Sequence, residues 1–212
     1  MTESTTRGRF VVLEGGDGSG KSTQARVLSD WLRARGVAVV ETFEPGAGAV
    51  GAVLRDVLLH GPAPVTPVAE ALLMAADRAQ HVATEIEPAL ARGDWVVCDR
   101  YVPSSLVYQG VVRGLGVDVV EQLSVVATGG LAPDVVVLLD VSDGIADMRR
   151  ADESRADERD RLEREGSAFH ASVRAAYRDL APARGWIVVD ADDTVDAVAE
   201  RVRDAVAPLL AG

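Results

Sequence analysis

Residues 10–22 read Phe-Val-Val-Leu-Glu-Gly-Gly-Asp-Gly-Ser-Gly-Lys-Ser, and this stretch decides the fold. Its first four residues are apolar and predict a buried strand. Residues 15–22 match G-x-x-x-x-G-K-[ST], the pattern of a loop that wraps its backbone around phosphate. A helical pattern follows at once, which is the context that the motif requires. The stretch therefore predicts a strand, a phosphate-binding loop and a helix.

The residues of this loop suit ATP. Its glycines let backbone N–H groups point at phosphate oxygens, and the start of the helix adds partial positive charge. Lys21 is the only lysine among 22 basic residues, and it stands where a compact ammonium must reach the β and γ phosphates. The Ser22 hydroxyl can ligate Mg²⁺. The expected ATP-binding residues of the loop are Gly15, Gly16, Asp17, Gly18, Ser19, Gly20, Lys21, Ser22 and Thr23.

Apolar runs rich in valine alternate along the chain with segments of helical period. Strands are predicted at residues 10–13, 37–40, 95–98, 135–139 and 186–189, and helices at 22–35, 67–91 and 195–210. Strands that are apolar nearly throughout are typical of parallel sheets covered on both faces, and strand–helix alternation implies right-handed crossovers. The expected fold is α/β, a doubly wound five-stranded parallel sheet with helices on both faces.

Composition and charge limit the classes of partner. With 212 residues, 48% of them apolar, the chain suits a single domain, expected at 9–212 after a polar tail at 1–8. The net charge of −11 disfavours nucleic acid polymers and anionic membranes, and no apolar run approaches the ~20 residues of a membrane span. Because the N-terminus lacks the apolar segment of a secretory signal and Cys98 is the only cysteine, we expect a cytoplasmic protein.

Two segments interrupt the alternation of strands and helices. Residues 60–67 are rich in proline and form a connector without evident chemistry. Residues 149–166 carry almost no apolar side chain. On charge pattern alone, this second segment is typical of a solvated helix laced with ion pairs between residues four apart.

A second strand ends in residues that suit a phosphate site. Asp99 can hold a metal ion beside the loop, and the adjacent Arg100 can grip a phosphate. Asp140 ends another strand and competes for the metal, but we favour Asp99 because Arg100 accompanies it. Glu14, at the end of the first strand, either holds water on the metal or is a plain strand-end carboxylate. The expected metal ligands are Ser22 and Asp99.

Two further charged residues stand in unusual surroundings. Asp17 lies inside the phosphate loop, where a carboxylate is electrostatically awkward unless it accepts a hydrogen bond from a substrate hydroxyl. Arg78 falls midway along a long apolar helix, next to Asp77, and either forms a structural ion pair or faces a ligand.

The ordered set of short motifs resembles the thymidylate kinase family. Besides the phosphate loop, the motifs are Glu44-Pro45-Gly46, Ala76-Asp77-Arg78-Ala79-Gln80-His81, Asp99-Arg100-Tyr101 with Ser104-Ser105, Tyr108-Gln109-Gly110 and Asp160-Arg161-Leu162-Glu163. Only the phosphate loop is specific by itself, but the order and spacing from residue 9 to about 205 are specific together. The resemblance implies a cytosolic, homodimeric P-loop kinase with a mobile lid, which uses ATP and Mg²⁺ to phosphorylate dTMP to dTDP for dTTP synthesis.

The resemblance also implies a role for each matching position. Asp17 would bind the 3′-hydroxyl of dTMP, Arg100 its phosphate and Arg78 the O4 edge of thymine. Ser105 would face the neighbouring ring edge, and Tyr108 would exclude a ribose 2′-hydroxyl. The implied catalytic residues are Lys21, Asp99, Arg100 and Arg161. The implied substrate-binding residues are Asp17, Glu44, Pro45, Met74, Arg78, Arg100, Ser104, Ser105, Tyr108 and Gln109.

By the same resemblance, the charged segment at about 150–166 is a lid over ATP. Some members of the family carry a catalytic arginine inside the phosphate loop, where this chain has Gly18. The lid would then supply that arginine, and Arg161 is the matching residue. Arg149 matches an arginine that stacks on adenine, although a plain exposed helical arginine explains it nearly as well.

The sequence departs from the family pattern on the acceptor side. The usual Thr-Arg-Glu-Pro-Gly-Gly-Thr reads Thr-Phe-Glu-Pro-Gly-Ala-Gly here, which removes a basic residue at Phe43 and a hydroxyl at Gly48. The position of the aromatic that commonly stacks on thymine is Met74, and two glycines are replaced by Val111 and Val112. These changes leave phosphoryl transfer untouched and bear on the grip and identity of the acceptor.

Two other functions remain open at the level of sequence. One is a kinase for another nucleotide or for a deoxynucleoside, and the other is a P-loop ATPase that switches a partner protein. A switch needs no second nucleotide pocket, whereas Arg78, Arg100 and Tyr108 stand where one would form. The chain contains no Asn, which disfavours a guanine-reading GTPase.

Overall fold

The computed structural model describes residues 7–61, 63–153, 161–162 and 165–211, and of residues 150–153 only the backbone. Most of the expected N-terminal tail and most of the expected lid lie outside these residues. The single domain at 9–212 therefore stays a prediction. The fold and the site described below are formed by the described residues.

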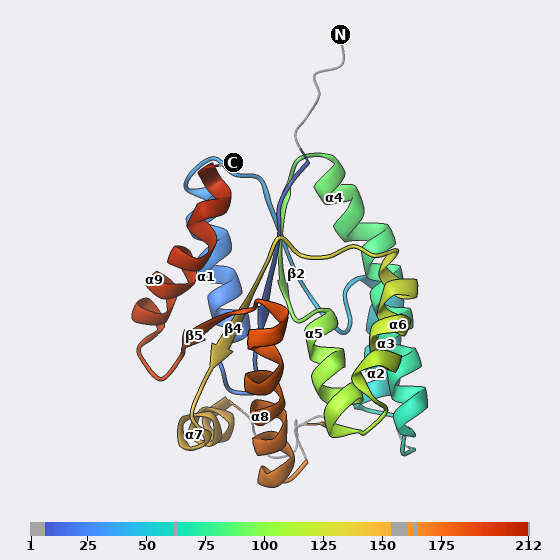
Figure 1. Cartoon of the computed structure of the whole chain (residues 1–212). Helices are drawn as coiled ribbons and strands as arrows, with labels where there is room; N and C mark the ends of the chain where they lie inside the picture. Colours follow the sequence, from blue (N-terminus) through green and yellow to red (C-terminus); the bar gives the residue numbers. More distant parts are fainter. Residues whose placement is uncertain (1–6, 62, 154–160, 163–164, 212) are drawn as a thin grey trace.

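A five-stranded parallel sheet lies at the centre of the molecule, in the order β2-β3-β1-β4-β5. The strands are β1 (Phe10–Glu14), β2 (Val39–Phe43), β3 (Trp95–Asp99), β4 (Val135–Asp140) and β5 (Ile187–Asp190). The central strand β1 is buried along its whole length. Figure 1 shows helices on both sides of this sheet, which confirms the predicted α/β fold.

The predicted bounds of β2 are wrong. The apolar run at 37–40 indicated that strand, but β2 pairs with β3 from Val39 opposite Trp95 to Phe43 opposite Asp99. Because β2 is an edge strand, only part of it is buried, and its carboxyl end is polar enough to escape a search for apolar runs. The other edge strand, β5, is also half exposed, although its sequence is apolar.

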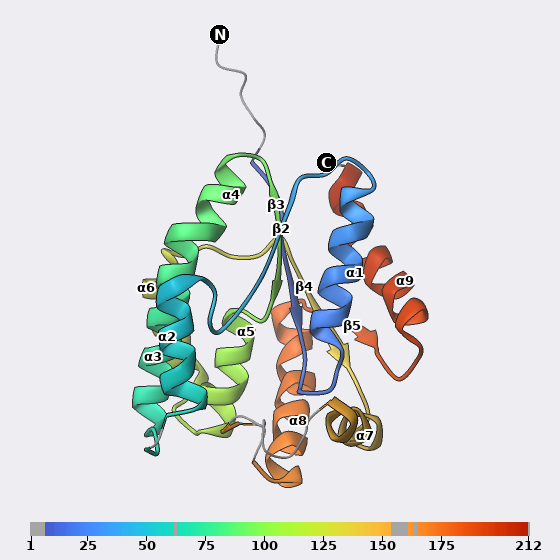
Figure 2. The ribbon, with the colours of Figure 1, turned by 180° about the vertical axis from the view of Figure 1, so that it is seen from behind.

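Two helices cover one face of the sheet. They are α1 (Lys21–Arg33), which leaves the phosphate loop, and α9 (Val195–Val206), whose buried valines repeat at helical spacing. Leu28 and Leu32 of α1 pack with Val198 and Val202 of α9 against Val11 and Leu13 of β1. In Figure 2, which shows the molecule from behind, α1 runs along the sheet. Both helices were predicted from the sequence within about two residues at their starts.

The other face is covered by a longer helical path. The helix expected at 67–91 consists of α3 (Pro67–His81), one π-helical segment (Val82–Ile86) and α4 (Glu87–Ala91). Beside it lie α5 (Val102–Ser105), which continues as a second π-helical segment (Leu106–Val112), and α8 (Ser167–Arg184). Phe10 and Val12 of β1 face this layer, so alternate residues of the central strand serve the two faces.

Several helices were not predicted from the sequence. They are α2 (Gly48–Leu59), α5, α6 (Val117–Thr128), α7 (Asp143–Glu153) and α8. Their apolar positions are diluted by small, polar or exposed residues, so that helical period alone does not reveal them. A short 3₁₀ helix (Ala207–Ala211) ends the described chain. Within the described ranges, every helix is too short or too polar to cross a lipid bilayer.

Candidate functional site

A cleft of about 870 Å³ opens at the carboxyl ends of β1, β2 and β3. This is the topological switch point of the sheet, where the connections that leave neighbouring strands pass to opposite faces. It gathers residues that the sequence spreads from Asp17 to His170. The predicted site residues that line it are Asp17, Gly18, Gly20, Lys21, Ser22, Thr23, Glu44, Pro45, Met74, Arg78, Asp99, Arg100, Ser104, Ser105, Tyr108 and Gln109. The cleft is therefore one continuous space from the phosphate loop to Arg78.

The phosphate loop is closed by its own lysine. Lys21 Nζ donates to the carbonyl oxygen of Gly16 at 2.9 Å, and it is almost fully buried. A side chain at Gly15 would put its Cβ 2.6 Å from the carbonyl oxygen of Leu139, so only glycine fits there. Burial lowers the pKa of Lys21, and the positive charge of Arg100 adds to this effect, while Asp99 and Asp17 oppose it. A bound phosphate would replace the hydrogen bond that Lys21 now makes to Gly16 within the loop.

Ser22 and Asp99 lie side by side at the mouth of the loop. The Ser22 hydroxyl donates to Asp99 Oδ2 at 2.5 Å, and the other carboxylate oxygen is buried without a hydrogen-bond partner among the described residues. Such an oxygen beside a hydroxyl fits Mg²⁺, which is commonly bound by one or two carboxylates plus substrate phosphates and water. No cluster of three or more acidic, His or Cys side chains suited to a metal occurs in the described ranges.

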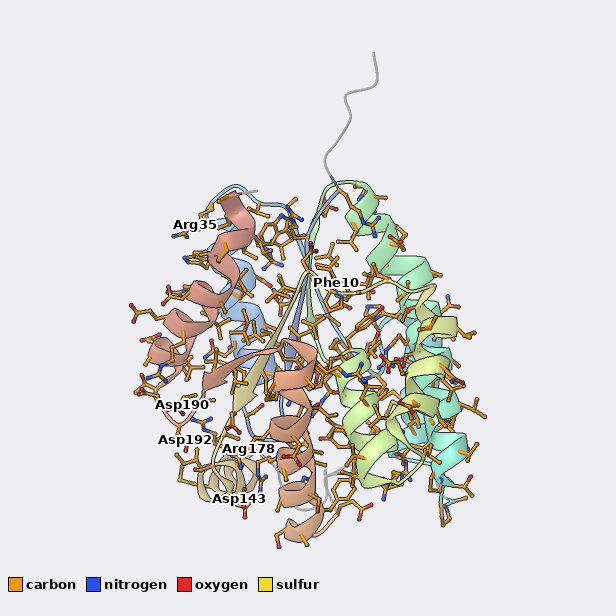
Figure 3. The ribbon with its side chains drawn as sticks, viewed as in Figure 1. Phe10, Arg35, Asp143, Arg178, Asp190 and Asp192 are labelled. Carbon is orange, nitrogen blue, oxygen red and sulfur yellow. The ribbon has the colours of Figure 1, made fainter. Side chains whose placement is uncertain are left out.

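The competing carboxylate Asp140 is engaged elsewhere. Arg178 of α8, labelled in Figure 3, donates from Nε to both oxygens of Asp140, at 2.8 and 3.0 Å. Asp140 is also absent from the lining of the cleft. The geometry therefore supports Asp99 over Asp140 as the ligand for a metal ion beside Ser22.

Arg100 crosses the cleft toward the phosphate loop. Its NH2 nitrogen contacts Asp17 Oδ1 at 2.5 Å, and its NH1 nitrogen donates to the carbonyl oxygen of Gly15 at 3.2 Å. The side chain is only 16% exposed. Its backbone has a φ of 73°, in the left-handed region that non-glycine residues seldom adopt. Residues held in this way cluster at functional sites.

Glu14 is buried beneath the cleft and does not line it. Its carboxylate accepts hydrogen bonds from the backbone N–H groups of Tyr101 and Ser104 and from the hydroxyls of Ser104 and Tyr177, at 2.7 to 3.1 Å. Burial raises the pKa of Glu14, against the opposing charge of Arg100 and these donors. With both oxygens occupied in this way, Glu14 is a strand-end anchor for the β3–α5 connection rather than a holder of metal-bound water.

Arg78 forms the far wall of the cleft. It donates to Glu44 Oε2 at 2.8 Å, to Ser105 Oγ at 3.0 Å and to the carbonyl oxygen of Tyr101 at 3.0 Å. A guanidinium carries five N–H donors, so these contacts leave capacity for a ligand. Arg78 therefore forms a buried ion pair with Glu44 and also lines the cleft, while its role toward a ligand stays a prediction.

An arginine lies close to Phe43, the position at which the family pattern has a basic residue. Arg55 of α2 lines the cleft, donates to the carbonyl oxygen of Pro45 at 2.7 Å and lies 5.9 Å from the centre of the Phe43 ring. Arg55 was not predicted as a site residue from the sequence, because the helix that carries it was not predicted. Met74 also lines the cleft and presents an apolar thioether at the position where the family commonly has an aromatic ring.

Helix α8 brings three further side chains to the phosphate loop. His170 Nδ1 lies 3.6 Å from Asp17 Oδ2, Arg174 packs over Gly16, and the Tyr177 hydroxyl reaches Glu14. These residues are four and three positions apart, so they share one face of the helix. That spacing was the only sign of them in the sequence.

Two predicted residues lie away from the phosphate loop. Arg161 donates from Nε to the carbonyl oxygen of Leu58 at 2.8 Å and pairs through NH2 with the buried Glu70 at 2.8 Å. Arg149 donates to the carbonyl oxygens of Ala191 and Asp193, in the loop after β5 that Asp190 and Asp192 mark in Figure 3. Neither side chain lines the cleft in this structure.

Asp77, which precedes Arg78 in α3, carries a buried carboxyl group with a raised pKa. Asp77 accepts a hydrogen bond from Gly46 N–H at 3.1 Å, and burial together with the Glu44 carboxylate raises the pKa of Asp77 to about 6. Because the folded-state pKa lies above the ordinary value of 3.8, the folded chain binds this proton more tightly than the unfolded chain. Stability from this group is therefore lost as the pH rises from about 4 to about 6.

We expect Asp77→Asn to remove that loss. The amide oxygen can still accept from Gly46 N–H, while the titration is abolished. The difference in Tm between the variant and the wild-type chain should grow in favour of the variant from about pH 4 to just above pH 6 and then stay level. Thermal unfolding at several pH values measures it. A difference that stays constant across this range would contradict the raised pKa.

A P-loop protein that only hydrolyses its nucleotide needs no second pocket. Here the cleft continues from Lys21 past Arg100 to a wall of Arg78, Ser105 and Tyr108, so that a second molecule can lie with one end at the transferred phosphate. The fold and the site thus define a P-loop phosphotransferase with an acceptor pocket.

Comparison with known proteins narrows this class. The family model described as thymidylate kinase matches residues 13–202. A protein named thymidylate kinase from Leifsonia xyli is 50% identical over 206 residues, covering 96% of this chain and 97% of the relative. Proteins of the same name from a Synechococcus strain and from Chromohalobacter salexigens are each 47% identical, over 93% and 91% of this chain and 94% and 92% of their own lengths. The chain belongs to the thymidylate kinase family.

Proposed function

We propose that the protein transfers the γ-phosphoryl group of ATP to dTMP and so forms dTDP for dTTP synthesis. The observation that carries the proposal is the continuous cleft, which joins the phosphate loop at Lys21 to an acceptor wall at Arg78 by way of Arg100. The relatives that are 47–50% identical to this chain are named thymidylate kinase, which is the name of this activity.

The chemistry asks for positioning and charge rather than for a general base. The phosphate of dTMP is already a nucleophile, and transfer through a loose transition state places negative charge on the moving phosphoryl oxygens. Lys21 and Arg100 both line the cleft and both contact the phosphate loop, Lys21 at Gly16 and Arg100 at Asp17. Their preorganised positive charges would stabilise the transition state more than the bound substrates.

Mg²⁺ is part of the proposal. Ser22 Oγ and the unpartnered oxygen of Asp99 would hold the ion, directly or through water. The ion supplies charge neutralisation at the β and γ phosphate oxygens when it is bound. On the protein side, Asp99 keeps the Ser22 hydroxyl oriented, because the two groups already share a hydrogen bond.

The acceptor wall would select the base and the sugar. Arg78, held by Glu44 and Ser105, can donate to an oxygen at position 4 of a pyrimidine. Tyr108 is buried and lines the cleft, and by the resemblance it would exclude a ribose 2′-hydroxyl. Met74 provides apolar contact for the thymine methyl without a rigid ring face.

A panel of acceptors tests the proposal. At fixed ATP and Mg²⁺ we expect kcat/KM to fall in the order dTMP, then dUMP, with dCMP and UMP far behind. One methyl in an apolar pocket is worth about 10–200-fold, and the flexible Met74 places dUMP near the low end of that range. Production of ADP in a coupled assay measures each rate.

The same panel separates the rival functions. Turnover of ATP without any acceptor would favour a P-loop ATPase switch, and thymidine as the better acceptor would favour a deoxynucleoside kinase. If dCMP or UMP reacts as well as dTMP, the roles of Arg78 and Tyr108 are wrong. The departures at Phe43, Gly48 and Met74 would then indicate a changed substrate.

We propose further that two copies of the chain associate in the cytoplasm, as the resemblance implies. The outer surfaces of α2, α3 and α6, which lie side by side in Figures 1 and 2, expose apolar side chains that a partner copy would cover. These residues are Val50, Val53, Val57, Val68, Leu72, Val119, Val125 and Val126.

Sedimentation tests the dimer. We expect the wild-type chain to sediment at twice its 22.3 kDa mass at micromolar concentration. Val126→Asp should shift the equilibrium toward the monomer, because Val126 is 84% exposed and a charge there costs nothing in the separate chain. A wild-type monomer at this concentration would exclude the proposal.

A further inference from the structure

The left-handed backbone conformation of Arg100 is stabilised by hydrogen bonds between the residues that follow it and the buried Glu14. Arg100 is the only non-glycine residue with positive φ among the described residues. Two backbone N–H groups that follow Arg100 in the chain, those of Tyr101 and Ser104, both donate to Glu14 Oε1, at 2.9 and 3.1 Å. A single buried carboxylate therefore fixes the turn that leads the chain from β3 into α5. The direction in which Arg100 leaves the sheet depends on that turn.

The hydroxyls of Ser104 and Tyr177 fix the other end of Arg100. Both lie within 3.4 Å of its NH1 nitrogen, and both lie 2.7 Å from Glu14 Oε2. Because NH1 can only donate, each hydroxyl offers its lone pair to Arg100 and can give its proton to Glu14, and the two hydroxyls also lie 2.9 Å from each other. The two hydroxyls thus connect the Glu14 carboxyl group to the guanidinium of Arg100 in one buried hydrogen-bond network.

Tyr177 brings this contact from a distant part of the chain. It lies on α8, on the same face as His170, which approaches Asp17, and Arg174, which covers Gly16. The ring of Tyr177 is fully buried and packs among Val107, Leu138 and Val173. A hydroxyl on so rigid a support has one position, which is what a positioning contact requires.

We propose that Tyr177, acting with Glu14, is a positioning residue that aims Arg100 at the phosphate of the acceptor. The inference rests on the proposed function, since it takes the acceptor to carry a phosphate. It adds a hydroxyl on α8 to the groups that set acceptor affinity, without direct contact between that hydroxyl and the substrate.

Tyr177→Phe tests the inference through two ligands, dTMP and thymidine, which differ only in the phosphate. Titration calorimetry without ATP measures both dissociation constants. We expect the constant for dTMP to rise roughly fivefold, as for the loss of one hydrogen bond, and the constant for thymidine to change less than twofold. The isosteric change deletes one buried oxygen and leaves the ring packed, so that the fold is retained.

Tyr101→Phe is the matched control. Tyr101 is also fully buried, but its hydroxyl donates to the carbonyl oxygen of Leu131 at 3.2 Å and makes no contact with Arg100. The ratio of the two dissociation constants should stay at its wild-type value in this variant. A second check is Tyr177→Phe in an Arg100→Ala background, where it should no longer alter the ratio.

The outcomes separate this inference from the proposed function. Equal weakening of dTMP and thymidine, no weakening of either, or the same change of ratio in Tyr101→Phe would overturn the positioning role. Persistence of the effect without the Arg100 side chain would overturn it too. If the wild-type chain itself binds thymidine as tightly as dTMP, the proposed acceptor phosphate site is wrong.

Discussion

Lys21→Ala is expected to lower kcat by about 10³-fold or more while the fold survives. Its ammonium is nearly buried and hydrogen-bonded to Gly16 at the place where the γ phosphate would lie. A preorganised charge at the transferred phosphoryl is worth about 4 kcal/mol of barrier, which corresponds to this factor. Steady-state kinetics together with circular dichroism measure the two effects.

Lys21→Arg should fail almost as badly. The loop wraps a compact ammonium, and the planar fork of a guanidinium cannot take its place in so small a space. Arg26→Ala serves as the control, because it removes one positive charge from the exposed side of the same helix. If either Lys21 variant is folded and nearly as active as the wild type, the assignment of the phosphate loop is wrong.

Arg161→Ala is expected to lower kcat by about 10²-fold or more with little change in the KM for ATP. An arginine that a lid supplies makes its contact mainly in the transition state, so that its loss affects the rate and not the ground state. In this structure Arg161 pairs with Glu70 and with Leu58, so that catalysis would require it to leave both partners.

Two comparisons decide whether Arg161 acts in catalysis. Glu70→Gln removes its charged partner, and equal losses of kcat and Tm in Glu70→Gln and Arg161→Ala would mean that the pair is only structural. Arg155→Ala and Arg159→Ala serve as neighbouring controls, although both residues lie outside the described residues. If Arg159→Ala is damaging and Arg161→Ala is mild, the register assigned to the lid is wrong.

Local sequence was sufficient for the central strands and for the phosphate loop. β1, β3 and β4 are buried on both faces, so their apolar runs stand out, and the loop needs glycines that no other residue replaces. The edge strand β2 and the helices α2, α6 and α8 were misplaced or missed. Their outward faces are free to vary, because they need only one buried stripe.

The division between sequence and tertiary structure follows from the range of the interactions. The sequence by itself determined the α/β fold, the phosphate loop and the motifs that led to the family, because these depend on hydrophobic period and on residues close together in the chain. Only the tertiary structure decided that Asp99 rather than Asp140 stands beside Ser22, and that Glu14 supports Arg100 from below. It also brought Tyr177 to Arg100 from 77 positions away. Such contacts join side chains on different elements, and their partners are set by how the elements pack and not by any spacing along the chain.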